Sequence, residues 1–225
     1  MGILSRVNYY FSLLRDDPIY LILYIIAILM SLILHECAHG YVALWCGDPT
    51  AKYYGRLTLD PRKHLDPLGT ISMMILGIGY AKPVPVNPRN FKNYRRDDIL
   101  VSLAGICMNL LLFLVSTTLF VILYKYTYAQ TSPVIRYLQR FLMLLAQLNV
   151  SLAIFNLLPI PPLDGYHVVN DIFLRGRFQL NGQTFQIAQI VLIVLMLTGA
   201  LSGFLSTVNS ALFNGLLNFL IRIFW

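Results

Sequence analysis

Charged side chains are scarce in this sequence. They make up 12% of its 225 residues, whereas 57% of the residues are hydrophobic and Glu36 is the only glutamate. Soluble proteins average about 25% charged residues, so this composition argues against a water-soluble fold. We find no repeat, low-complexity tract or flexible linker that would divide the chain.

The sequence also lacks the cysteine patterns that stabilise small domains. Its three cysteines, Cys37, Cys46 and Cys107, lie in or beside apolar segments and form no CxxC pair. Neither a disulfide framework nor a thiolate zinc site is expected. We interpret the three thiols as small buried residues.

Apolar stretches of about the length of a membrane span are abundant. They cover Ile19–Leu34, Ile99–Tyr124, Tyr137–Leu158, Ile187–Leu201 and Phe204–Trp225. The first continues as a helix to Cys46, where Gly47, Asp48 and Pro49 stop it. We therefore expect an all-α polytopic membrane protein with about four to six membrane-embedded helical segments. The C-terminal part, 187–225, could cross once or form a hairpin.

The net charge of +7 follows the expected membrane topology, so no nucleic-acid partner is expected. The loop between the first two spans holds Lys52, Arg56, Arg62, Lys63, Lys82, Arg89, Lys92, Arg95 and Arg96. The next loop holds only Lys125, Arg136 and Arg140. By the positive-inside rule, loop 48–98 is cytoplasmic and the N-terminus lies outside. We expect the protein to be an integral, multi-pass protein of the cell membrane.

Composition divides the chain into three parts. Residues 1–17 have apolar residues at helical spacing and predict a helix on the membrane surface. Residues 18–175 contain the polar motifs described below and are expected to form the core. Residues 176–225 are expected to form C-terminal membrane helices.

The loop between the first two spans is dense in glycine and proline. Its segments Tyr53–Leu59 and Tyr80–Val86 have a strand-like composition, which predicts a small membrane-associated β-hairpin. Leu68–Ile78 is apolar but too short to span, which predicts a re-entrant or interfacial segment. His64 lies among charged residues and is expected to be solvated or to have a structural role at the surface.

The sequence His35-Glu36-Cys37-Ala38-His39 is an HExxH motif in an apolar helix. Residues four apart share a face of a helix, so the two imidazoles can bind one zinc ion. Glu36 projects beside them, where it can take a proton from water. Two histidines satisfied by neighbouring helices are the alternative, but such polar groups cost several kcal/mol in lipid unless they face one another or a cation.

A catalytic zinc ion commonly has three protein ligands, and Asp164 is the best candidate for the third. It follows a span and a proline-rich break, where irregular backbone could line a polar cavity. As an alternative, Asp164 could cap the helix that begins near Gly165. His167 could replace Asp164 as ligand, bond to the site from outside it, or be structural.

Two amides in or at the end of apolar spans are candidate substrate-binding or oxyanion-binding residues. Asn109 could donate to a developing oxyanion or hold substrate backbone. Asn156 could have either of these roles as well. For both residues, a hydrogen bond between helices is the alternative.

Three motifs occur in the order HECAHG (35–40), AKPVPVNP (81–88) and NLLPIPPLDG (156–165). Together they resemble the site-2 protease family of intramembrane zinc metalloproteases, in its minimal branch without PDZ or CBS domains. The resemblance implies that His35, His39 and Asp164 bind one zinc ion per chain and that Glu36 is catalytic. It also implies that the predicted hairpin meets the substrate. One departure is Ile106, where many members have the proline of an AGPxxN segment.

We therefore expect residues 18–175 to be the metalloprotease core of an enzyme that cuts membrane proteins within or next to their transmembrane segments. A metal-binding membrane transporter is an alternative, although its inverted repeat is missing. A catalytically inactive scaffold is another, although the set of ligands and base is complete. The substrate and the oligomeric state are not indicated by the sequence.

Overall fold

The protein, as a computed structural model, is described for residues 12–66, 82–127, 132–174 and 181–225. In chain order its helices are α2 (Pro18–Cys46), α3 (Thr50–Tyr53), α4 (Pro61–His64), the 3-10 helix η1 (Pro88–Asn90), α6 (Tyr94–Thr127), α7 (Pro133–Asn156), α8 (Asp164–Phe173), α9 (Gly182–Thr198) and α10 (Ser202–Phe224). Four of them, α2, α6, α7 and α10, are long and apolar enough to cross a membrane, and α9 is shorter. The expected helical membrane architecture is confirmed, and the four candidate spans among the described residues agree roughly with the expected four to six segments. The first residues, 1–11, and the segment Leu68–Ile78 lie outside the described residues.

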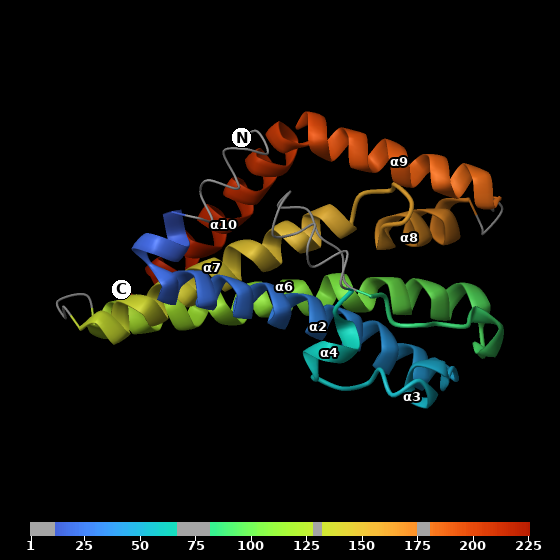
Figure 1. The fold of residues 1–225 in the computed structure, drawn as a ribbon, viewed down its shortest axis with the longest axis horizontal. Coiled ribbons are helices and arrows are strands. Elements are labelled where there is room, and N and C mark those ends of the chain that lie inside the picture. The colour runs from blue at the N-terminus through green and yellow to red at the C-terminus, as the bar shows by residue number, and fades with distance from the viewer. Residues whose placement is uncertain (1–11, 67–81, 128–131, 175–180) are drawn as a thin grey trace.

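Helix α6 lies at the centre of the fold. It packs against α2, α7, α8 and α10, and Figure 1 shows α2, α6 and α7 running side by side along the long axis. Ala27 of α2 lies against Leu144 and Leu145 of α7, and Phe113 of α6 packs near Phe213 of α10. Small residues such as Ala27 let backbones approach closely, as is typical of helix pairs in lipid.

Helix α2 has clear signals at both ends. The carboxylate of Asp17 accepts a hydrogen bond from the N–H of Tyr20 (3.1 Å), and Pro18 opens the helix. Gly47 closes it in the left-handed conformation, with φ of 109°. The 29 residues span about 43 Å, more than the roughly 30 Å of a hydrocarbon layer. One end of α2 must therefore extend beyond the layer or the helix must tilt.

The predicted β-hairpin is not formed by the described residues. In the first predicted segment, Tyr53 ends α3 and residues 54–59 contain a turn and a bend, and in the second, residues 82–86 are extended but belong to no strand. The aromatic composition was misleading because the carboxylate of Asp48 accepts from the N–H of Thr50 (3.1 Å), which starts a helical turn. In the second segment, Pro83 and Pro85 lack the N–H groups that a ladder requires.

Of the two roles expected for His64, the solvated one is also wrong. Its side chain is 1% exposed, and Nε2 lies 2.7 Å from the carbonyl oxygen of Thr58. The backbone carbonyl of His64 accepts from the N–H of Lys82 (2.8 Å). The charged neighbours of His64 point outward, whereas this ring fills the space between α4 and α2.

Candidate metal centre

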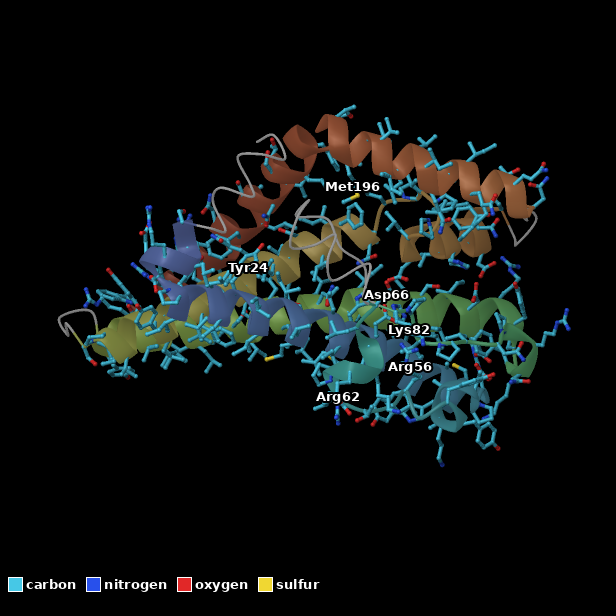
Figure 2. The ribbon with its side chains drawn as sticks, in the orientation of Figure 1. Tyr24, Arg56, Arg62, Asp66, Lys82 and Met196 are labelled. Carbon is cyan, nitrogen blue, oxygen red and sulfur yellow. The ribbon has the colours of Figure 1, made fainter. Side chains whose placement is uncertain are left out.

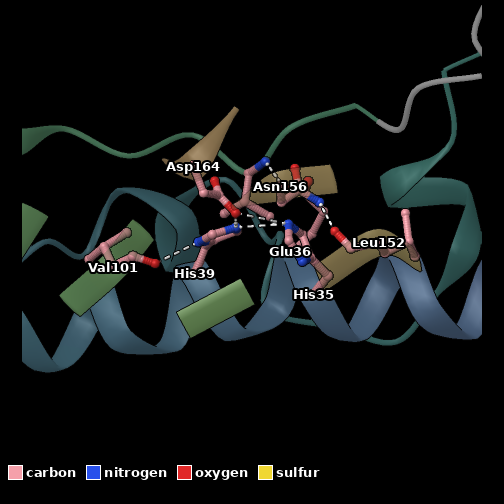
Figure 3. Close-up of polar contacts among 8 residues, drawn as sticks. His35, Glu36, His39, Val101, Leu152, Asn156 and Asp164 are labelled. Carbon is pink, nitrogen blue, oxygen red and sulfur yellow. Dashed lines mark hydrogen bonds and ion pairs between the residues drawn. The ribbon is translucent and has the colours of Figure 1, made fainter. Parts of the chain in front are cut away.

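Three side chains from two helices meet at one point. His35 and His39 lie one turn apart on α2, and Asp164 is the first residue of α8. The Nε2 atoms of His35 and His39 are 3.0 Å apart, and Asp164 Oδ2 lies 3.5 Å from the first and 3.4 Å from the second (Figure 3). Both histidines are more than nine-tenths buried. This is the group of potential metal ligands found within the described ranges.

The hydrogen bonds around these atoms leave a place for a cation. His39 Nδ1 lies 2.7 Å from the carbonyl oxygen of Val101, so in the neutral ring this nitrogen carries the proton. His39 Nε2 then directs a lone pair at Asp164 Oδ2, which is buried and has no hydrogen-bond partner among the described residues. Lone pairs that face each other in a buried site are unfavourable unless a proton or a metal ion lies between them.

The separations also fit the size of a zinc site. Zinc holds nitrogen and oxygen ligands at about 2.0–2.1 Å in a tetrahedron, which places neighbouring ligand atoms about 3.3 Å apart. The three observed separations are 3.0, 3.4 and 3.5 Å. Three protein ligands would leave the fourth position for water or substrate, as in catalytic zinc sites.

Gly105 allows α6 to lie against both histidines. A Cβ atom at this position would lie 2.5 Å from His35 Cε1 and closer still to His39 Nε2. The site therefore requires glycine here, because any side chain would displace an imidazole. Sequence reasoning missed this role, although Gly105 stands out as the glycine of an otherwise apolar span.

Asp164 is placed by the broken backbone that precedes α8. The helix has no side-chain cap, so the alternative role of Asp164 as a capping residue is not supported. The next residue, Gly165, packs directly on the backbone of Leu157 and Leu158, where a Cβ atom would clash. This close contact fixes the first turn of α8 and leaves the Asp164 side chain free to point toward α2 (Figure 3).

Glu36 contacts a backbone group from a distant part of the chain. Its Oε2 accepts a hydrogen bond from the N–H of Val84 at 2.8 Å, and Figure 3 shows Glu36 beside His35 and His39. The extended segment 82–86 is held in turn by Arg56, whose Nη2 donates to the carbonyl of Lys82 at 2.5 Å (Figure 2). Arg56 is 6% exposed. The sequence analysis counted it only among the positive residues that indicate membrane topology and did not predict this buried contact.

The other predicted polar residues lie outside the trio. Asn109 is fully buried beside His35, and neither amide atom makes a well-formed hydrogen bond among the described residues. The Nδ2 atom of Asn156 donates to Leu152 within its own helix (3.0 Å). His167 Nδ1 lies 3.3 Å from Asp98 Oδ2. None of these contacts tests the substrate-binding role expected for Asn109 and Asn156, which stays a prediction.

Comparisons with known proteins point to one family. The model of "Peptidase family M50" matches residues 23–199. "Putative zinc metalloprotease YwhC" of Bacillus subtilis is 43% identical over 174 residues, which cover 77% of this chain and 80% of that protein. "Putative zinc metalloprotease Rip2" of Mycobacterium tuberculosis is 33% identical over 181 residues, covering 78% and 66%.

"Putative zinc metalloprotease Rip2" of Mycolicibacterium smegmatis is 32% identical over 186 residues, with 80% of this chain and 69% of that protein covered. No solved structure matches the chain. The names of these relatives and the site formed by His35, His39 and Asp164 confirm zinc as the expected cofactor.

Proposed function

The chain belongs to peptidase family M50, and we propose that it hydrolyses peptide bonds within or next to the transmembrane segments of other membrane proteins. Family membership, the names of the relatives and four apolar helices support a membrane zinc protease. The observation that carries the proposal is the meeting of Asp164 with the two histidines of HExxH, with Glu36 beside them. This combination supplies three ligands and a base at one buried point.

In the proposed mechanism His35, His39 and Asp164 hold the metal. When bound there, zinc lowers the pKa of water and polarises a peptide carbonyl as a Lewis acid. His39 is kept in the tautomer that exposes Nε2 by its contact with the Val101 carbonyl (2.7 Å). Burial of both rings excludes bulk water, so electrostatic interactions within the site are stronger than in solvent.

Glu36 is the proposed general base and then general acid. The N–H of Val84 holds Oε2, which leaves Oε1 to accept a proton from the attacking water. The same carboxyl group would then protonate the amine that leaves. Anchoring one oxygen matters because a base must be within hydrogen-bond reach of the proton that it removes.

The substrate segment would lie extended beside residues 82–86. A helical substrate satisfies its carbonyl groups internally, so it must unwind locally before its peptide bond can be attacked. The segment 82–86 is itself extended and lies against Glu36 through Val84. Asn109 and Asn156 remain candidates to bind the substrate or the oxyanion.

We further propose that the site lies toward the cytoplasmic side of the cell membrane. The C-terminal end of α2 and the N-terminal end of α6 border a loop that holds seven lysines and arginines, and two more arginines lie in the first turn of α6. Residues 18–175 would form the protease core, 1–17 an interfacial segment and 176–225 the C-terminal membrane helices. Labelling of single cysteines introduced at exposed positions 53 and 134 would test the orientation.

The Glu36→Gln variant tests the catalytic proposal. Wild-type and variant chains would be expressed in cells, and the fragments of membrane proteins compared by mass spectrometry. We expect cleavage to stop in the variant while its zinc content stays near one per chain, because Glu36 is not a proposed ligand. Cleavage at the wild-type rate by a folded, zinc-loaded Glu36→Gln chain would overturn the mechanism.

A further inference from the structure

Helix α8 carries one proposed zinc ligand but is too short to hold its own position. It has ten residues, and isolated helices below about 12 residues are marginal in water. Within the described part of the chain, α8 packs mainly on α6. The position of Asp164 therefore depends on how α8 docks onto α6 as well as on the packing of Gly165 against Leu157 and Leu158.

A cluster of four polar residues joins the two helices. His167 Nδ1 of α8 lies 3.3 Å from Asp98 Oδ2 of α6, and Arg95 Nη2 of α6 donates to the backbone carbonyl of Asp171 at 2.5 Å. Burial and the neighbouring carboxyl group of Asp98 raise the pKa of Asp171 to about 6, and Asp171 Oδ2 has no hydrogen-bond partner among the described residues. Asp98 is 8% exposed and Asp171 is 2% exposed, so neither is an ordinary surface charge.

The cluster and the metal centre lie on the same faces of both helices. On α8, His167 and Asp171 follow Asp164 at spacings of three and seven residues, which keeps all three on one side. On α6, Val101 and Gly105 follow Asp98 at the same spacings. Val101 and Gly105 both contact the histidines. One helix–helix contact therefore has the polar cluster at one end and the metal centre at the other.

We propose that Asp98, His167, Asp171 and Arg95 form a tether that docks α8 on α6 and so positions Asp164 to bind the metal. This inference rests on the proposed role of Asp164 as a zinc ligand. Asp98 and His167 are positioning residues, because they touch neither the metal position nor the substrate but act through Asp164. The hydrogen bond that His167 Nδ1 donates to the carboxylate of Asp98 raises the pKa of His167, which favours a charge-assisted contact.

Zinc affinity, measured on the full-length chain in lipid nanodiscs by competition with a chelator, tests the tether. We expect Asp98→Ala and His167→Leu to weaken zinc binding by about 10- to 100-fold, the range typical when a group that supports a ligand is removed. His167→Asn should bind zinc nearly as tightly as wild type, because its amide can replace Nδ1 as a donor to Asp98. Proteolysis by the two weakened variants should recover at high zinc concentration.

Asp17→Ala is the matched control. Asp17 joins α2 to α7 at the far end of the bundle, through Arg140 (3.0 Å) and Tyr137 (3.0 Å). Its loss should lower the unfolding temperature of the metal-free chain without changing zinc affinity. If Asp98→Ala and His167→Leu lower stability in the same way but bind zinc like wild type, the tether is only structural and the inference is wrong.

The Asp164→Asn variant separates the two proposals. Weak zinc binding by Asp164→Asn together with normal binding by the tether variants would reject the tether alone. Normal zinc binding by Asp164→Asn would instead reject the proposed ligand set, and the tether with it. If His167→Asn binds zinc as weakly as His167→Leu, the hydrogen bond with Asp98 does not determine zinc affinity and the inference is wrong.

Discussion

At the scale of single residues, the orientation of the proposed base depends on a backbone group far along the chain. Glu36 Oε2 accepts from the N–H of Val84 at 2.8 Å, and Val84 stands between two prolines. Proline at position 84 has no N–H and so removes the donor, but it also replaces the buried valine side chain, which packs near Gly40. A second variant that loses the same packing and keeps the N–H therefore isolates the contact.

We expect the Val84→Pro variant to lose about tenfold or more of its proteolytic rate, because a displaced catalytic group can cost up to about a hundredfold. Its zinc content should not change, since no ligand is touched. The rate would be measured on a purified membrane-protein substrate. Val84→Ala, which keeps the N–H and loses side-chain packing, is the control; equal rates for the two variants would exclude the positioning role.

Gly105→Ala should damage the metal centre. The added methyl group would lie about where the imidazoles of His35 and His39 are, and overpacking of this kind typically costs about 1–3 kcal/mol. We expect less zinc per chain by atomic absorption and a matching loss of activity. Gly215→Ala, where an added methyl group has no heavy atom within 4 Å, should leave both unchanged. Full zinc loading of Gly105→Ala would contradict the close approach of α6.

The site could be predicted from sequence only where spacing along one helix decides the geometry. His35, Glu36 and His39 lie within two turns, so their proximity follows from the helix alone. Asp164 was predicted because a catalytic zinc ion needs a third protein ligand in addition to the two histidines. Gly105 and Val84 could not be found in this way, because their importance arises when α6 and the extended segment pack against α2.

At the scale of elements, the corner after α2 is fixed by one buried carboxylate. Asp48 is 0% exposed and accepts from the N–H of Asn87 (2.7 Å), Nδ2 of Asn90 (2.7 Å), and the N–H and hydroxyl of Thr50. Burial alone would raise the pKa of Asp48, but these hydrogen bonds together bring it below its usual value. The end of α2 is thereby joined to the segment that positions Val84.

Stability should depend on Asp48 in acid. A folded-state pKa below the unfolded value of about 3.9 means that the carboxylate stabilises the protein above that pH and that this contribution is lost as pH falls through the lower folded pKa. We expect Asp48→Asn to cost about 2 kcal/mol at pH 7, as hydrogen bonds to a charged group do. The difference from wild type should shrink below about pH 4 in thermal unfolding scans. A difference that stays constant with pH would contradict the assignment.

Sequence patterns predicted long elements well and short ones poorly. Apolar runs of spanning length defined α2, α6, α7 and α10, because lipid leaves few alternatives to a helix. The segment Tyr53–Leu59 was misread as strand, because the helical turn that begins with the hydrogen bond from Thr50 to Asp48 outweighed the preference of the tyrosines for strands. The sequence did not decide whether 187–225 crosses the membrane once or forms a hairpin, because the apolar run of α9 is too short to be identified as a span.

At the scale of the whole molecule, the metal would join elements that otherwise meet through α6. His35 and His39 belong to α2 and Asp164 to α8, and α2 packs on α6 as α8 does. A ligand that binds only the folded state stabilises it by about 4 kcal/mol at a thousand times its dissociation constant. We expect removal of zinc by a chelator to lower the unfolding temperature measurably in detergent. Asp164→Asn should abolish most of this response, and an unchanged response would argue against its role as a ligand.

The wide separation of the ligands along the chain has a consequence for biosynthesis. The ribosome completes His35 and His39 early, but Asp164 and the turn that positions it emerge only after α7 has been made. A nascent chain that ends before Asp164 holds two of the three ligands and lacks the contact between α6 and α8. The metal centre would therefore stay incomplete until most of the chain had been inserted into the membrane.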